Sequence, residues 1–119
     1  MDADPELLDL FFSETAANAA AARRILSSDR AAPSERAVVA RAFHTLAGTA
    51  GLVGHPAWGR VAAAAERLAR RWLSTGDAPP GVVDLLRETL YAVGAFAAER
   101  AGAPPAALCE RLQKTVGSS

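Results

Sequence analysis

Prolines divide the chain into five segments of helical periodicity. All seven prolines stand at or beside the start of a segment. Proline is tolerated in the first turn of a helix but not in its interior, so each of these positions predicts a helix start. Within the segments, apolar residues recur every three or four positions, which is the spacing of one helix face. This pattern predicts five helices, at about residues 5–27, 33–53, 56–74, 80–101 and 104–116.

The composition favours helix throughout. Alanine provides 29 of the 119 residues, whereas valine, isoleucine and threonine together provide only 15, so intrinsic propensity favours helix over sheet. Connections of a few residues force neighbouring helices to lie antiparallel. The sequence therefore predicts an all-α fold in one domain of residues 1–119. We expect an antiparallel up-down four-helix bundle with a short fifth C-terminal helix.

One apolar stripe on each predicted helix is expected to face the core, and Asp4 is expected to cap the first helix ahead of Pro5. The stripes comprise Leu8, Phe12, Thr15, Ala19, Ala22 and Leu26; Val39, Phe43, Leu46, Ala50 and Val53; Trp58, Val61, Ala65, Leu68 and Trp72; Val82, Leu86, Leu90, Val93 and Phe96; and Leu108, Leu112 and Val116.

Net charge, polarity and cysteine content indicate which partners and which compartment are expected for the protein. Thirteen basic and thirteen acidic residues cancel, which argues against nucleic acid as a partner because phosphate binding needs a basic face. The 18 residues from Ala42 to Gly59 carry no charged side chain, but four glycines and a proline make them unsuitable for a membrane span. The lone Cys109 and the lack of a signal segment predict a cytoplasmic domain, which we expect to be monomeric.

Common catalytic constellations are missing from the sequence. It contains no C-x-x-C, H-E-x-x-H, phosphate-loop or G-x-S-x-G motif. The two histidines, His44 and His55, would lie about 16 Å apart along a helix, too far to share a metal ion. We expect no bound metal and no enzyme acting alone, and we expect His55 to cap the third helix.

His44 differs from His55 because of its predicted helix face. It lies nearly opposite the apolar stripe, and the residues expected on its face are Ala40, Arg41, Ala47, Gly48 and Gly51. A mid-helix glycine costs about 1 kcal/mol relative to alanine, so two of them need an explanation. One explanation is a partner that approaches the imidazole closely. The alternatives are an ordinary surface histidine and glycines that mark close helix packing.

The segment that begins at His44 carries a family resemblance. It reads His-Thr-Leu-Ala-Gly-Thr-Ala-Gly-Leu-Val-Gly up to Gly54. This resembles the histidine phosphotransfer (HPt) motif, whose pattern is His, any residue, aliphatic, Lys, Gly, Ser or Thr, Ala or Ser, two free positions, aliphatic, Gly. Only the lysine is missing, and Ala47 replaces it. Residues 5–14 also resemble the first helix of the N-terminal phosphotransfer domain of CheA-type chemotaxis kinases.

The resemblance implies a mechanism. His44 would take a phosphoryl group from the ATP-binding domain of a histidine kinase and pass it to an aspartate of a response-regulator receiver domain. No cofactor is implied for this domain, because ATP and Mg²⁺ act through the partner kinase. Glu66, 22 residues after His44, matches a family glutamate that orients the imidazole. Without the resemblance, Glu66 would be a surface pair with Arg70 one turn on.

The surface around His44 is the expected docking site for partner proteins, and a second function is also possible. Docking is expected around His44, on Arg41, Ala47, Gly48 and Gly51 with part of the first helix. Arg41 could supply a cation in place of the lysine, whereas Arg60, Arg67 and Arg71 are expected on a solvated face. The alternative function is a helical protein-interaction domain that keeps the HPt fold but has lost phosphotransfer, for which Ala47 is the best support.

Overall fold

The computed structural model of the protein describes residues 4–28, 32–75 and 77–118. Within these ranges the secondary structure is helical and contains no strand. The elements are α1 (Pro5–Leu26), α2 (Pro33–Thr49), the 3₁₀ helix η1 (Ala50–Val53), α3 (Pro56–Thr75), α4 (Pro80–Glu99) and α5 (Ala106–Ser118). None of the helices in this described part has the length and apolar character needed to cross a membrane.

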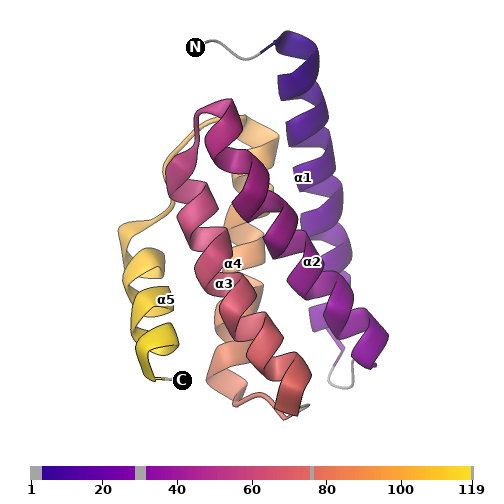
Figure 1. Cartoon of the computed structure of the whole chain (residues 1–119), viewed down its shortest axis with the longest axis vertical. Helices are drawn as coiled ribbons and strands as arrows, with labels where there is room; N and C mark the ends of the chain where they lie inside the picture. Colours follow the sequence, from indigo (N-terminus) through magenta and orange to yellow (C-terminus); the bar gives the residue numbers. More distant parts are fainter. Residues whose placement is uncertain (1–3, 29–31, 76, 119) are drawn as a thin grey trace.

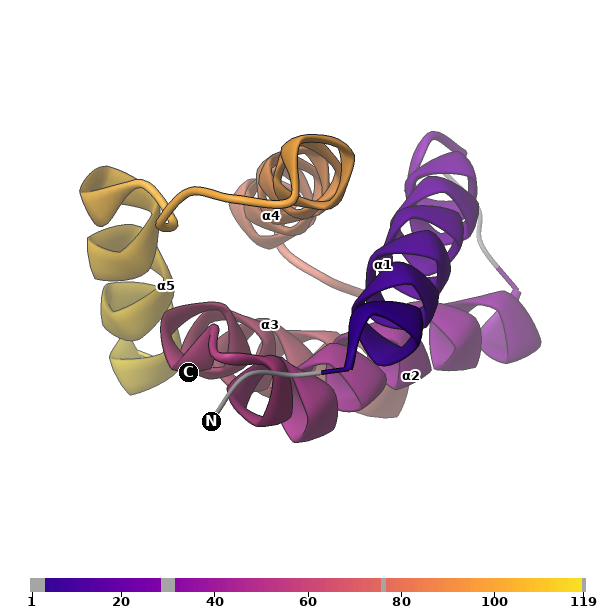
Figure 2. The same ribbon diagram turned by 90° about the horizontal axis from the view of Figure 1, so that it is seen from above.

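The first four helices form a bundle in which each helix packs against its neighbours in the chain, and α4 closes the ring against α1 (Figure 1). Helix α5 lies outside this ring, against α3 and α4 (Figure 2). The predicted up-down four-helix bundle with a short fifth C-terminal helix is confirmed. In this arrangement α2 lies between α1 and α3.

The helix starts follow local side-chain chemistry. Asp4 caps α1, since its Oδ1 accepts a hydrogen bond from the backbone N–H of Glu6 at 2.8 Å, and Pro5 occupies the first turn as predicted. At the start of α2, the Glu35 carboxylate accepts from the backbone N–H of Ala32 at 3.1 Å. Both contacts satisfy backbone donors that a helix N-terminus leaves unpaired.

Most helix boundaries lie within two residues of the prediction, and two of the differences have a local structural reason. The second helix does not continue unbroken to Val53, because the α-helix ends at Thr49 and the last turn tightens into η1. The fifth helix begins at Ala106 rather than at 104. The reason is the Pro104–Pro105 pair: a residue before proline is disfavoured in helical conformation. The predicted exit turn of the third helix at residues 74–77 includes Gly76, which lies outside the described residues.

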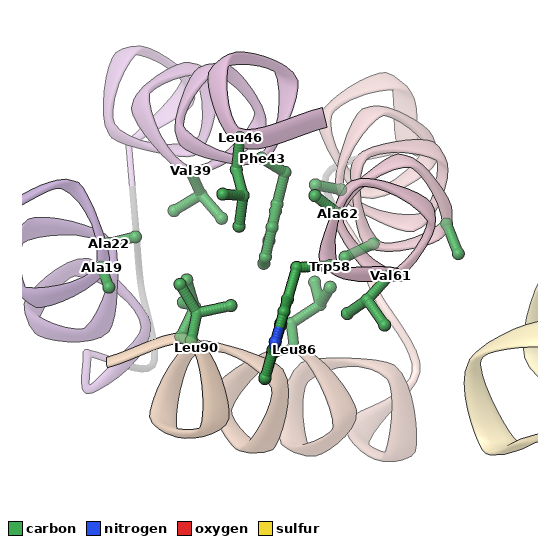
Figure 3. Packing of buried hydrophobic residues seen from close by; sticks show 14 of the residues in the cluster. Ala19, Ala22, Val39, Phe43, Leu46, Trp58, Val61, Ala62, Leu86 and Leu90 are labelled. Atoms are coloured by element: carbon green, nitrogen blue, oxygen red, sulfur yellow. The ribbon is translucent and has the colours of Figure 1, made fainter. Parts of the chain in front are cut away.

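Each predicted stripe contributes to the core, and the side chains of the four bundle helices converge on one central space (Figure 3). Five residues, each at one end of its stripe, are only half-buried: Leu8, Val53, Trp72, Val82 and Val116. Burial extends beyond the stripes to Phe11, Leu85, Thr89 and Ala97. The Trp58 indole stacks on the Phe96 ring, and its Nε1–H donates to the carbonyl of Gly102 at 2.7 Å. This bond ties the segment before α5 to the bundle.

Gly54 ends η1 in the left-handed conformation, with φ of 88°. We expect Gly54→Ala to destabilise the fold by about 1 kcal/mol, because a side chain is unfavourable at this φ. Gly94→Ala is the matched control: Gly94 lies inside α4, and a Cβ there would meet no described atom within 4 Å. That change should stabilise the fold by up to about 1 kcal/mol. Urea unfolding measures both, and equal effects of the two substitutions would contradict the assignment of Gly54 as a conformational stop.

Candidate functional site

His44 presents its ring to solvent on α2. Its side chain is 67% exposed, and Arg41, Gly48 and Gly51 on the same side of the segment are also exposed. Four of the six residues expected on the outward face are therefore exposed. The imidazole is therefore accessible to another protein.

The two glycines beside His44 do not serve helix packing. A Cβ added at Gly48 or Gly51 would meet no atom of the described neighbours within 4 Å. Gly59 of α3 does face the neighbouring helix, and a Cβ there would lie 3.5 Å from the carbonyl oxygen of Ala47, which is an ordinary van der Waals distance. The packing explanation for Gly48 and Gly51 is therefore wrong.

Two residues predicted on the His44 face lie elsewhere. Ala40 is buried, with 2% exposure, and Ala47 is half-buried and packs against the core. The helical wheel treated α2 as having one inner side, but α2 packs against both α1 and α3. Its buried arc is wider than one stripe, so small side chains on the flank toward α3 are covered. The backbone approach of Ala47 to Gly59 marks this flank.

Glu66 of α3 reaches His44 across the helix interface. The Nδ1 atom of His44 lies 3.0 Å from Oε2 of Glu66. A carboxylate can only accept, so Nδ1 carries the proton in this contact. The Glu66 side chain is 14% exposed, far less than the imidazole. The contact therefore holds the ring from its inner edge and leaves its other nitrogen, Nε2, with a free lone pair.

The same Glu66 oxygen also binds Arg70. The Nε–H of Arg70 donates to Oε2 at 2.7 Å, so the surface pair that was the alternative for Glu66 is present as well. The two interpretations are compatible because one carboxylate oxygen has room for more than one donor. The site thus contains three side chains, His44, Glu66 and Arg70, joined at one atom.

This arrangement suits nucleophilic attack by an imidazole. A neutral ring with its proton on Nδ1 presents a nucleophilic lone pair at Nε2 near pH 7. When Nε2 forms a bond, the ring gains positive charge, and the carboxylate of Glu66 lies where it stabilises that charge. The site can therefore accept and return an electrophilic group without a second catalytic residue.

His55 has a different environment. Its ring packs edge-to-face against Phe96 and Phe12, with centroid distances of 4.9 and 6.0 Å. Its backbone carbonyl accepts from the N–H of Trp58 at 3.1 Å, at the start of α3. His55 thus lies at the predicted cap position, and its imidazole joins an aromatic cluster. No group of three or more His, Cys, Asp or Glu side chains that could hold a metal ion occurs in the described ranges.

An apolar groove beside the His44 face was missed from the sequence. It runs between α1 and the α2–η1 segment, and Thr45, the neighbour of His44, lines it. Three exposed leucines contribute to its wall: Leu7 at 48%, Leu10 at 54% and Leu52 at 77% exposure. The available signal was the apolar pair Leu7 and Leu10, which lies outside the core stripe of the first helix. The first helix thus contributes apolar surface next to the exposed histidine.

Comparison with known proteins identifies one family. The family model described as "Hpt domain" matches residues 6–96 of the 119-residue chain. The matched segment includes α1, α2, η1, α3 and most of α4, and with them His44, Glu66 and Arg70. Neither the curated proteins nor the solved structures include a significant match.

Proposed function

The chain belongs to the Hpt domain family, the phosphotransfer domains of two-component phosphorelays, and we propose that His44 is its phosphoryl acceptor. The observation that carries the proposal is the exposed imidazole whose Nδ1 contacts Glu66 at 3.0 Å. This contact leaves Nε2 free at the surface, where a partner can reach it. Glu66 is the residue that orients the ring.

The transfer in each direction follows from this geometry. The Nε2 lone pair attacks the γ-phosphorus of ATP held by the partner kinase; the N–P bond forms, the bond to the bridging oxygen breaks, and ADP leaves with the electron pair. The ring becomes positively charged, and its Nδ1–H donates to Glu66. A receiver aspartate then attacks the phosphorus, the N–P bond breaks, and its electron pair returns to Nε2.

Hpt domains interact with histidine kinases and response regulators. For this chain we propose that the receiver docks on the face of Arg41, Gly48 and Gly51 and extends into the α1–α2 groove. Support comes from the open space over both glycines and from the exposed Leu10 and Leu52, which line the adjacent groove. Protein interfaces usually combine an apolar centre with polar residues at the rim. The apolar groove and the polar His44 face next to it together have this composition.

Gly48→Arg tests the docking face. A side chain at Gly48 meets no described atom within 4 Å, so helicity should be kept or raised, while the arginine obstructs approach to His44. We expect normal phosphorylation by a small donor and at least a tenfold slower transfer to a receiver domain that the wild-type domain phosphorylates. Circular dichroism and transfer kinetics measure the two effects. Gly81→Arg is the control that should leave both unchanged, because Gly81 lies in the first turn of α4, a helix that packs against α1, α3 and α5. Normal transfer by the Gly48 variant would contradict this docking face.

The proposal extends to the kind of phosphorelay. We propose that the domain resembles most the N-terminal phosphotransfer domain of CheA-type kinases, on the support of the His44–Glu66 spacing and contact and of α5. It would act in the cytoplasm, since the partner kinase uses ATP. Incubation with ATP-binding domains of this type and radiolabelled ATP should give an acid-labile phosphate on the domain. If the replacement of lysine by Ala47 means that phosphotransfer is lost, no donor will label it.

A further inference from the structure

Arg70 shares its carboxylate partner with His44. It lies one turn after Glu66 on α3, and its Nε and Nη2 atoms lie 2.7 and 2.5 Å from Oε2 of Glu66. The Nδ1 atom of His44 lies 3.0 Å from the same oxygen. A single atom of Glu66 therefore links the imidazole to a guanidinium.

We infer that Arg70 is a positioning residue for phosphoryl transfer at His44, acting through Glu66; the inference rests on the proposed function of His44. The degree of burial supports this role. The Glu66 side chain is 14% exposed, whereas those of His44 and Arg70 are 67% and 58% exposed. The carboxylate is thus the inner, common partner of two side chains that reach it from the surface.

The first contribution of Arg70 is orientation. Glutamate has three rotatable side-chain bonds, and a contact with His44 alone would restrain its carboxylate through one hydrogen bond. Arg70 adds two nitrogen contacts to the same oxygen, and the planar guanidinium constrains direction better than a single donor. A fixed Oε2 keeps the proton on Nδ1 of His44 and the lone pair on Nε2.

The second contribution is charge. A carboxylate orients the imidazole but also places a negative charge beside the phosphoryl group that approaches His44. The Glu66–Arg70 pair carries no net charge, so the ring is oriented without an uncompensated anion. The motif position one turn after His44 holds Ala47 and offers no cation there. Arg70 brings one to the site from α3.

The test compares Arg70→Gln with Arg67→Gln, an exposed arginine on the same helix. Phosphoramidate serves as donor, because it transfers its phosphoryl group to Nε2 with loss of ammonia and needs no kinase. Arg70→Gln should slow labelling of His44 by about 3- to 10-fold, less than the loss of Glu66 itself. Nitrogen NMR of the imidazole should show a shift from the Nδ1–H tautomer toward a mixture of both tautomers. Arg67→Gln should change neither measurement.

Two further variants separate positioning from a structural role. Arg70→Lys keeps the charge with a single donor group and should recover part of the rate. Glu66→Ala combined with Arg70→Gln should be no slower than Glu66→Ala alone, because Arg70 acts through Glu66. A wild-type rate and tautomer ratio in Arg70→Gln, or additive losses in the double variant, would overturn the inference. A wild-type domain that gains no phosphoryl group on His44 would instead overturn the proposed function, and the tautomer measurement would still test the role of Arg70.

Discussion

Replacement of His44 by glutamine should abolish phosphorylation of the domain while the bundle stays folded. The ring is 67% exposed and contributes no core packing, so its loss removes only one surface contact, with Glu66. Such contacts contribute at most about 1 kcal/mol to stability. Glutamine has no nucleophilic nitrogen, since its amide lone pair is delocalised. Labelling by phosphoramidate and by a histidine kinase with ATP, with circular dichroism alongside, measures the effect.

His55→Gln is the control for this experiment. The His55 ring packs against Phe96 and Phe12 and is half-buried, so the substitution should lower the free energy of unfolding without stopping phosphorylation. Label retained in the His44 variant at the wild-type level would contradict the assignment of the acceptor. Label lost in the His55 variant, with the fold intact, would contradict it as well.

Glu66→Ala should give the second-largest effect. The substitution removes the partner of Nδ1 and lets the ring rotate and change tautomer, so Nε2 is no longer consistently the nucleophile. We expect phosphorylation to slow by about 10- to 100-fold, the range typical of the loss of an orienting partner. Alanine is a better helix former than glutamate, and the Arg70 side chain, which is 58% exposed, can be solvated once its partner is removed. The thermal unfolding midpoint should therefore change little.

Glu110→Ala on α5 provides a matched control, because it removes an exposed carboxylate of the same kind outside the segment that matches the family. It should leave the phosphorylation rate unchanged. If Glu66→Ala is phosphorylated as fast as this control, Glu66 does not orient the imidazole. Measurement of rate and unfolding on the same samples distinguishes this result from misfolding.

Local sequence signals determined most of the fold. Prolines and the Asp4 side chain determine where helices start, because their effects act within one helical turn. Apolar periodicity identifies the core stripes for the same reason: the angle between successive residues is a property of the helix itself. The exposed position of His44 follows from that periodicity, and the spacing to Glu66 follows from the motif resemblance.

The positions of side chains between helices depended on the tertiary structure. Ala40 is buried because α2 packs against both α1 and α3, and a single helical wheel contains no information about a second neighbour. The joint contact of His44 and Arg70 with one oxygen of Glu66 likewise depends on the distance between α2 and α3. That distance is set by packing of side chains remote in sequence. The sequence alone predicted that His44 and Glu66 are partners, whereas the packing of α2 against α3 decided how these two residues share hydrogen bonds with Arg70.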